Sequence, residues 1–310
     1  MISRRSLLKG AGLKSAGIIA AAVSSLGGYA IAFEPMRHRV TRYALTPPNW
    51  TPGLKLKLAV LADIHACHPW MSADRIHSIV AKTNALNPDM TLLLGDFVAG
   101  RRLSGYSSPV PTRDWSGALA DLKAPLGVHA VLGNHDWWED DEAQRTRRGP
   151  TLIHRALLDV GIPVYENNAK SFVKNGHPFW LIGLGDQWAF INRRGNSSAP
   201  RWTRYEGRHD LPETLAQVSS AAPIICMAHE PDIFASMPHR VALTLSGHTH
   251  GGQVSVLGYA PLVPSRYGQR YRYGHIVEDN RSLIVSAGLG CSNVPVRFGA
   301  PPEIVLIELG

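Results

Sequence analysis

Short apolar runs recur along the chain, and most of them end in Gly, Asp or His. Runs of this length between turn residues are typical of buried strands, whereas apolar positions three and four apart indicate helices. We expect strands at 56–62, 90–94, 128–132, 179–184, 224–228, 241–245, 283–286 and 304–307. We expect helices from Ser72 to a stop at Pro88, and from Thr151 to Val160 with Gly161 closing the second.

Strands that alternate with helices predict a layered α/β domain, in which functional residues gather where strands end. The 310 residues are enough for one large core, and no internal repeat or composition break divides them. Two stretches without strong periodicity, 100–111 and 187–208, are rich in Arg, Gly, Ser, Asn or Pro. We expect long loops there, and such loops often frame active sites.

The first 32 residues differ from the rest. Arg4 and Arg5 precede an apolar stretch over 15–32, where the small residues at 30–32 offer a cleavage site. We expect a twin-arginine-type signal peptide at 1–32, read by the twin-arginine export machinery, and therefore a protein of the periplasm or cell envelope. A general secretory signal is an alternative because Leu7 stands where Phe is commoner, and an uncleaved membrane anchor is another. Residues 33–54 are then a lead-in segment and residues 55–310 the main domain.

The net charge and the cysteines exclude some classes of partner and site. Four of the basic residues behind the formal charge of +8 lie in the first 32 positions, so +4 is left after cleavage and no nucleic-acid partner is implied. The three cysteines, Cys67, Cys226 and Cys291, form no CxxC pair, which argues against a disulfide scaffold or a thiolate zinc site. One disulfide could form after export, but buried free thiols are the simpler interpretation.

Five polar clusters follow the apolar runs. They are Asp63-Ile64-His65, Gly95-Asp96, Gly133-Asn134-His135-Asp136, His229, and Gly247-His248-Thr249-His250-Gly251-Gly252. In extended segments Asp63 and His65 face the same way, as do His248 and His250, so each pair offers two ligands to one pocket. Imidazole, carboxylate and amide oxygen form a mixed shell that suits Mn, Fe or Zn better than Ca. The glycines allow tight turns and a close backbone approach to ions and phosphate.

In this order and at strand ends, the five clusters resemble the calcineurin-like metallophosphoesterases, whose pattern is D-x-H, G-D, G-N-H-D or G-N-H-E, a lone H, and G-H-x-H. The resemblance spans residues 63–250. It implies a four-layer α/β/β/α sandwich with two mixed sheets and two divalent transition-metal ions at the carboxyl ends of the strands. Together with the export signal, the run from Gly247 to Gln253 is similar to the YaeI- and YkuE-type branch of bacterial phosphodiesterases.

The resemblance also implies a role for each site residue. One metal ion would be held by Asp63, His65 and His250, the other by Asn134, His229 and His248, with Asp96 as a bridge. His135 would face the substrate and protonate the leaving group. Mn is the expected metal, with Fe or Zn as alternatives.

The implied activity is hydrolysis of a phosphate diester or pyrophosphate through a metal-bridging hydroxide, on a small-molecule or lipid-linked substrate. The alternatives are a phosphomonoesterase and an inactive protein that binds metal or phospho-ligands. One departure matters, because many relatives carry G-D-x-x-D-R. This chain has Ala99 where the acid that orients His135 would stand, and only Arg101 or Arg102, out of register, could reach phosphate.

Two stretches beside the motifs have alternative interpretations. Trp137 and Trp138 follow the third cluster and could stack on a substrate group or simply pack. Residues 266–273 interleave arginines with tyrosines, and could hold an anionic substrate or form a solvated edge strand.

Overall fold

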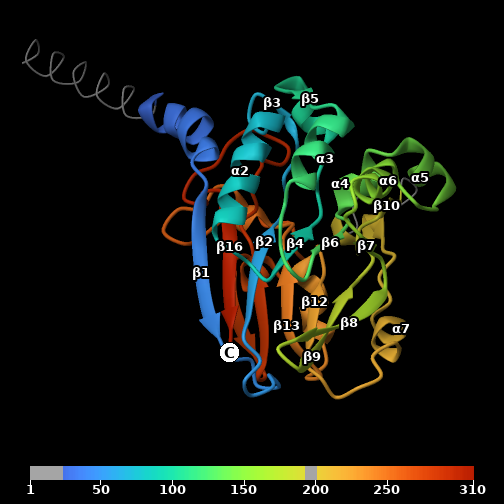
Figure 1. Ribbon diagram of the computed structural model, residues 1–310. Helices are drawn as coiled ribbons and strands as arrows, with labels where there is room; N and C mark the ends of the chain where they lie inside the picture. The colour runs from blue at the N-terminus through green and yellow to red at the C-terminus, as the bar shows by residue number, and fades with distance from the viewer. Residues whose placement is uncertain (1–23, 193–200) are drawn as a thin grey trace, which may run out of the picture.

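The computed structural model describes residues 24–192 and 201–310, and two six-stranded sheets form its centre (Figure 1). The first sheet contains β1 (Arg39–Leu45), β2 (Leu56–Leu61), β4 (Met90–Leu94), β6 (Val128–Val131), β7 (Val164–Tyr165) and β16 (Glu303–Leu309). The second contains β8 (Asn168–Lys174), β9 (His177–Gly183), β12 (Ile224–Met227), β13 (Val241–Ser246), β14 (Gly274–Glu278) and β15 (Arg281–Val285). Their orders are β1-β16-β2-β4-β6-β7 and β14-β15-β13-β12-β9-β8, and each mixes parallel with antiparallel pairs.

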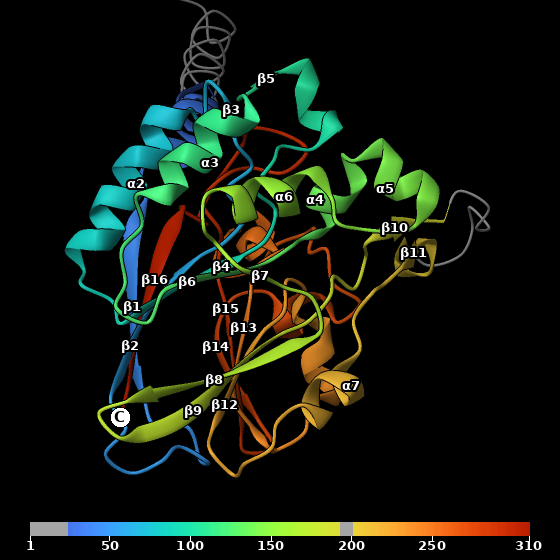
Figure 2. The ribbon, with the colours of Figure 1, turned by 45° about the vertical axis from the view of Figure 1, so that its right-hand side comes forward.

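Helices cover the outer face of each sheet, which confirms the expected four layers (Figure 2). The first sheet is covered by α2 (Ala73–Ala85), α3 (Thr112–Ala120) and α6 (Leu152–Asp159), with α4 (Asn134–Trp138) and α5 (Asp141–Thr146) nearby. The thinner cover of the second consists of α7 (Leu211–Ala216), η5 (Pro231–Ser236) and η7 (Gly268–Tyr271). Buried apolar side chains fill the space between the two sheets as well as the space under each helical layer.

The expected strands and the two expected helices are present, with ends shifted by at most two residues for most of them. Side-chain caps fix both helix starts, because Ser72 accepts from the N–H of Arg75 and Thr151 accepts from the N–H of His154. The expected loops contain short elements, namely η3 (Arg101–Gly105), β5 (Ser108–Pro109), β10 (Phe190–Ile191), η4 (Arg201–Arg204) and β11 (Tyr205–Glu206). β5 pairs with β3 (Cys67–His68), and β10 pairs with β11.

The segment before residue 55 packs against the main domain and adds a strand to its first sheet. β1 pairs in parallel with β16 along its whole length. Ahead of it, η1 (Tyr29–Phe33) and η2 (Glu34–Met36) contact the last long loop, since Ala30 O accepts from Arg297 N at 2.9 Å and buried Glu34 accepts from Ala300 N at 2.8 Å. The paired arginines of the expected signal peptide lie outside the described residues. Within 24–192 and 201–310, no helix combines the length and apolar character that crossing a membrane requires.

Candidate metal centre

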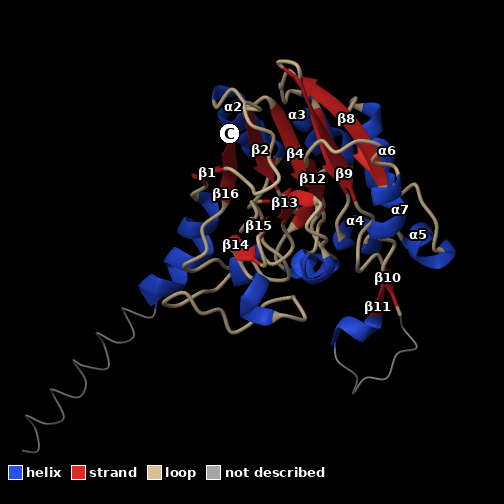
Figure 3. Cartoon of the chain, turned by 90° about the horizontal axis from the view of Figure 1, so that it is seen from below, coloured by secondary structure: helices blue, strands red, loops and turns tan. Residues whose placement is uncertain are grey.

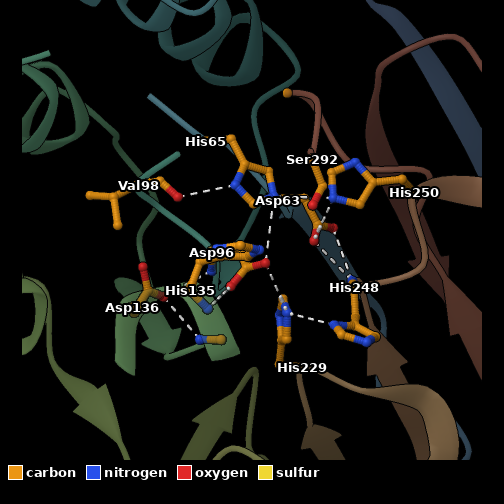
Figure 4. Close-up of polar contacts among 12 residues, drawn as sticks. Asp63, His65, Asp96, Val98, His135, Asp136, His229, His248, His250 and Ser292 are labelled. Carbon is orange, nitrogen blue, oxygen red and sulfur yellow. Dashed lines mark hydrogen bonds and ion pairs between the residues drawn. The ribbon is translucent and has the colours of Figure 1, made fainter. Parts of the chain in front are cut away.

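The eight residues singled out in the sequence converge at one end of the sandwich, and Figure 4 labels all of them except Asn134. All of them follow the carboxyl ends of β2, β4 and β6 in the first sheet or β12 and β13 in the second, so the site joins the two sheets. None exposes more than 8% of its surface. Their polar atoms must therefore be satisfied by one another or by a bound group, because bulk water does not reach them.

Six of these residues form two adjacent groups of potential ligand atoms. Asp63, His65 and His250 make one group, and Asp96, His229 and His248 the other, with the ligand atoms of each group within 4.8 Å of one another. Nε2 of His65 lies 3.1 Å from Nε2 of His250. Oδ2 of Asp96 lies 3.4 Å from Nε2 of His65 and 3.4 Å from Nε2 of His229. Asp96 therefore faces both groups, as a bridging ligand must.

Hydrogen bonds orient two imidazole rings so that their other ring nitrogens face the site. Nδ1 of His65 donates to the carbonyl of Val98 at 3.0 Å, and Nδ1 of His229 donates to the carbonyl of Leu94 at 2.6 Å. With the proton on Nδ1, each Nε2 presents a lone pair inward, which is the tautomer that metal ligation needs. Oδ1 of Asn134 is buried without a hydrogen-bond partner among the described residues. The unpartnered Oδ1 of Asn134 and the inward-facing imidazole nitrogens fit divalent cations, which would coordinate all of these atoms.

Burial and neighbouring charges together set the protonation of these groups. It lowers the pKa of His65 to about 3 and holds the pKa of His250 well below its usual value. It also raises the pKa of Asp63 to about 7. Burial acts to raise the pKa of Asp96 too, but the facing histidines, above all His229, hold that pKa well below its usual range. Burial acts to lower the pKa of His229, but the carboxylates around it, above all Asp96, raise that pKa well above its usual value. A cation bound at this ring would displace its proton.

The backbone at the ligands is left-handed, which corrects the expectation of extended segments. The φ angles lie between +47° and +67° at Asp63, His65, Asp96, His248 and His250. The members of each pair converge because the chain turns sharply where the strand ends, rather than through alternation along a strand. Sparsely populated backbone conformations cost about 1–3 kcal/mol each and cluster at functional sites. The surrounding fold therefore holds the ligands in a strained, pre-set arrangement.

Two glycines make room for side chains of the site. A Cβ at Gly133 would lie 2.4 Å from Oδ1 of Asp96. A Cβ at Gly100 would lie 2.3 Å from Cε1 of His135. Any side chain at either position would displace a residue of the site.

Glu139 supplies the acid that the sequence lacks at Ala99. Its Oε1 lies 3.4 Å from Nδ1 of His135, four residues earlier and one helical turn away. Arg101 donates from Nε to Glu139 at 2.9 Å and from Nη2 to Asp141 at 2.7 Å, so two carboxylates hold this arginine. Burial acts to lower the pKa of His135, but the carboxylates around it, Asp96 and Glu139 among them, raise it above its usual value.

Asp136 fixes the loops that carry the ligands. Its carboxylate accepts from the N–H groups of Asp96 at 2.8 Å, Phe97 at 2.8 Å and Gly133 at 2.9 Å. The recorded hydrogen bonds of this carboxylate go to these three backbone groups and not to the imidazole of His135. Asp136, the acid of the G-N-H-D motif, therefore connects the loop after β4 to the loop after β6 through hydrogen bonds.

A further buried acidic pair lies beside His229. Asp186 and Glu230 bring carboxylate oxygens within 4.8 Å of a ring nitrogen of His229 and of each other. Oδ1 of Asp186 accepts from Trp188 N at 2.8 Å, and Oε2 of Glu230 accepts from Gln187 N at 3.0 Å. The pair therefore holds the loop after β9 against the site. A sequence signal for Asp186 exists, since it follows an apolar run and a glycine, as Gly-Asp does after β4.

Aromatic rings line one side of the centre. Trp138 stacks on Tyr205 with ring centroids 4.9 Å apart, and Tyr205 stacks on Trp188 at 4.7 Å. The ring of Trp138 lies 5.2 Å from that of His135, and the ring of Trp188 lies 4.6 Å from that of His248. The tryptophan that precedes Trp138 is instead buried in the core, as the packing interpretation predicted. All three cysteines are buried free thiols, also as expected.

Residues 56–252, which contain every candidate ligand, match the calcineurin-like phosphoesterase family. The chain belongs to this family. Calcineurin-like phosphoesterases hydrolyse phosphoesters with divalent metal ions, so the resemblance seen in the motifs is confirmed and the protein is a metal-dependent phosphoric ester hydrolase.

Full-length relatives include two bacterial members of the family. The chain is 28% identical over 315 residues to the metallophosphoesterase YkuE of Bacillus subtilis, covering 99% of this chain and 98% of that one. It is 28% identical over 321 residues to the phosphodiesterase YaeI of Escherichia coli, covering all of both chains. A transmembrane protein with a metallophosphoesterase domain from Danio rerio is 29% identical over 263 residues. That match covers 82% of this chain but 53% of the fish protein.

Proposed function

We propose that this calcineurin-like phosphoesterase is an exported dinuclear-metal phosphodiesterase. The observation that carries the proposal is the place of Asp96, whose Oδ2 lies 3.4 Å from a histidine of each ligand group. A site for a single ion would not need the second group. One ion would be held by Asp63, His65 and His250, the other by Asn134, His229 and His248, and Asp96 would serve both. Mn best matches this N/O donor set, with Fe or Zn as alternatives.

His135 is the proposed proton donor. When bound, the two divalent ions supply a nucleophile at neutral pH and stabilise charge on the phosphoryl oxygens. The protein's own task is then to protonate the leaving oxygen. With Nδ1 turned towards Glu139, Nε2 of His135 is the ring nitrogen that can donate that proton. The raised pKa keeps more of this imidazole protonated near neutral pH.

A diester is the proposed substrate class. The relative YaeI is described as a phosphodiesterase and aligns with the whole of this chain. The leaving group of a natural diester is a poor one and gains most from general acid catalysis, which gives His135 a use. Trp138, whose ring lies 5.2 Å from that of His135, could stack on an apolar part of the leaving group. A phosphomonoesterase is the alternative.

Metal removal and reloading test the proposal. Protein stripped by a chelator is expected to be inactive and to recover with Mn, because Oδ1 of Asn134 and Nε2 of His248 are buried without another partner among the described residues. The recovered enzyme should hydrolyse an aryl phosphate diester faster than the matching aryl monoester. Metal analysis of the active sample should find two ions per chain. An active sample with at most one ion would contradict the dinuclear site, and faster monoester hydrolysis would favour the alternative.

Export is proposed to follow the twin-arginine route, with cleavage after Ala32. Replacing Arg4 and Arg5 together with Lys preserves the charge but removes the pair that the export receptor recognises, so the protein should stay in the cytoplasm. The matched control replaces Lys9 and Lys14 with Arg, which should leave export unchanged. Cell fractionation distinguishes the outcomes. Normal export of the Arg4/Arg5 variant would rule out this route, and an exported chain that keeps residues 1–32 would favour the anchor.

A further inference from the structure

Exposed apolar side chains gather on the loop that follows the last metal-binding motif. We call residues 254–265 the apolar loop, because none of them is charged. Val256 and Tyr259 pair across a tight turn, and the leucine at the tip of that turn, Leu257, is completely exposed. Leu262 exposes 80% of its surface and Tyr259 62%. Large apolar side chains this exposed and this close together commonly mark a contact surface.

In the chain before cleavage, the N-terminal segment continues the same surface. The ring of Tyr29 meets that of Phe298 edge-on with centroids 6.2 Å apart, and the carbonyl of Phe298 accepts from Ser255 N at 2.6 Å. Phe298 thus links η1 to the apolar loop. Ile31 and Phe33 expose 44% and 54% of their surfaces there. In Figure 3 the N-terminal helix and the nearby loops lie on one side of the molecule, away from α5 and α6.

The stretches of sequence that form this face contain few acidic residues. The sequence has no Asp or Glu between Asp232 and Glu278, and none from residue 280 to 302 or from 1 to 33. Arg272 stands at the base of the apolar loop, where it donates to the carbonyl of Gly258 at 3.0 Å and to that of Gly251. Arg266 and Arg270 flank the loop and pair with the acids that border the acid-free run.

We propose that this face docks the protein on a lipid bilayer that carries anionic headgroups. The exposed leucines would enter the interfacial region while Arg272 meets headgroup phosphate. Charge favours an anionic bilayer over a neutral one, because Arg272 stands at the base of the apolar loop and no Asp or Glu lies between residues 233 and 277. A second copy of the chain would bring a face of the same charge, which disfavours self-association.

Docking would hold the metal centre near the membrane. The 3-10 turn η6 (His250–Gly252) leads directly from a ligand into the apolar loop. A phosphoester in a lipid headgroup would then lie near the site. The docking proposal does not rest on the proposed activity, because binding to vesicles can be measured without a substrate.

The test places a reporter at the tip of the apolar loop in the full-length chain. Leu257→Cys is labelled with an environment-sensitive dye, and Cys67, Cys226 and Cys291 are buried and should stay unlabelled. A blue shift is expected with vesicles of phosphatidylcholine and phosphatidylglycerol, a smaller one with phosphatidylcholine alone, and less at high salt. The matched control is Leu152→Cys on α6, 60% exposed on the opposite side, which should show no shift.

A second substitution tests the apolar contact itself. Adding Leu262→Glu to the labelled protein should weaken vesicle affinity at least about tenfold, because one leucine is lost from the interface and a charge is added. Adding Leu158→Glu instead, on the exposed face of α6, should leave vesicle affinity unchanged. No shift of the Leu257 label on anionic vesicles, or equal effects of the two glutamates, would overturn the proposal. A blue shift of the label that appears without vesicles and grows with protein concentration would also overturn the proposal, because a second copy of the chain would then cover the face.

Discussion

Replacing Asp96 with Asn is expected to release both metal ions and to abolish most of the activity. Oδ2 of Asp96 faces both ligand groups, and its Oδ1 accepts from the N–H of His135 at 2.8 Å. The amide has similar size but no charge to offset two cations. Removing one group that stabilises charge in the transition state typically costs about 10²- to 10³-fold, so kcat/KM should fall by at least that factor. Metal analysis and steady-state kinetics on an aryl diester measure the two effects.

Two variants serve as controls for this substitution. His65→Ala removes a ligand of one group only, so it should keep the ion held by the other. Asp121→Asn makes the same chemical change at a carboxylate whose side chain is 68% exposed, and it should keep both ions and full activity. If His65→Ala and Asp96→Asn release both ions equally, Asp96 is not a bridge.

The interior strands could be predicted because each is a continuous apolar run, as in β4, where all five residues are buried. The edge strands β1, β8 and β14 could not be predicted in this way. Their residues are exposed or half-buried, and their pairing partner lies on one side only, so Lys, Arg, Thr and His are tolerated. Only the tertiary structure shows that β1, from the segment before the main apolar runs, lies beside β16 at the end of the chain.

The candidate ligands could be predicted from residue type and order, because parallel strands bring their carboxyl ends to one edge. Their local geometry could not. A left-handed backbone at Asp63 or His250 depends on the turn imposed by neighbouring strands, and no alternation pattern reveals it. Glu139 also escaped prediction. Its contact with His135 requires that both lie on one helical turn, and α4 is too short for a periodic apolar pattern to show where it begins.

Replacing His135 with Ala should separate proton donation from metal binding. The imidazole lies outside both ligand groups, so the variant should retain both ions and the fold. A general acid contributes about 10²- to 10⁴-fold, so kcat should fall by that factor for diesters with poor leaving groups. The loss should shrink for good leaving groups, which need no proton. Kinetics over a series of leaving groups, with metal analysis of the same samples, measures both quantities.

Two further variants show whether the position and the protonation of His135 matter separately. Gly100→Ala should reproduce much of the defect without touching the imidazole chemically, because its Cβ would lie 2.3 Å from Cε1 of the ring and force the ring to move. Glu139→Gln should remove a carboxylate that raises the pKa of His135. The acid form is active and exists below that pKa, so the loss of activity at alkaline pH should begin at a lower pH than in the wild type. Loss of metal from His135→Ala would make this histidine a ligand, and full activity on poor leaving groups would transfer the donor role to another residue.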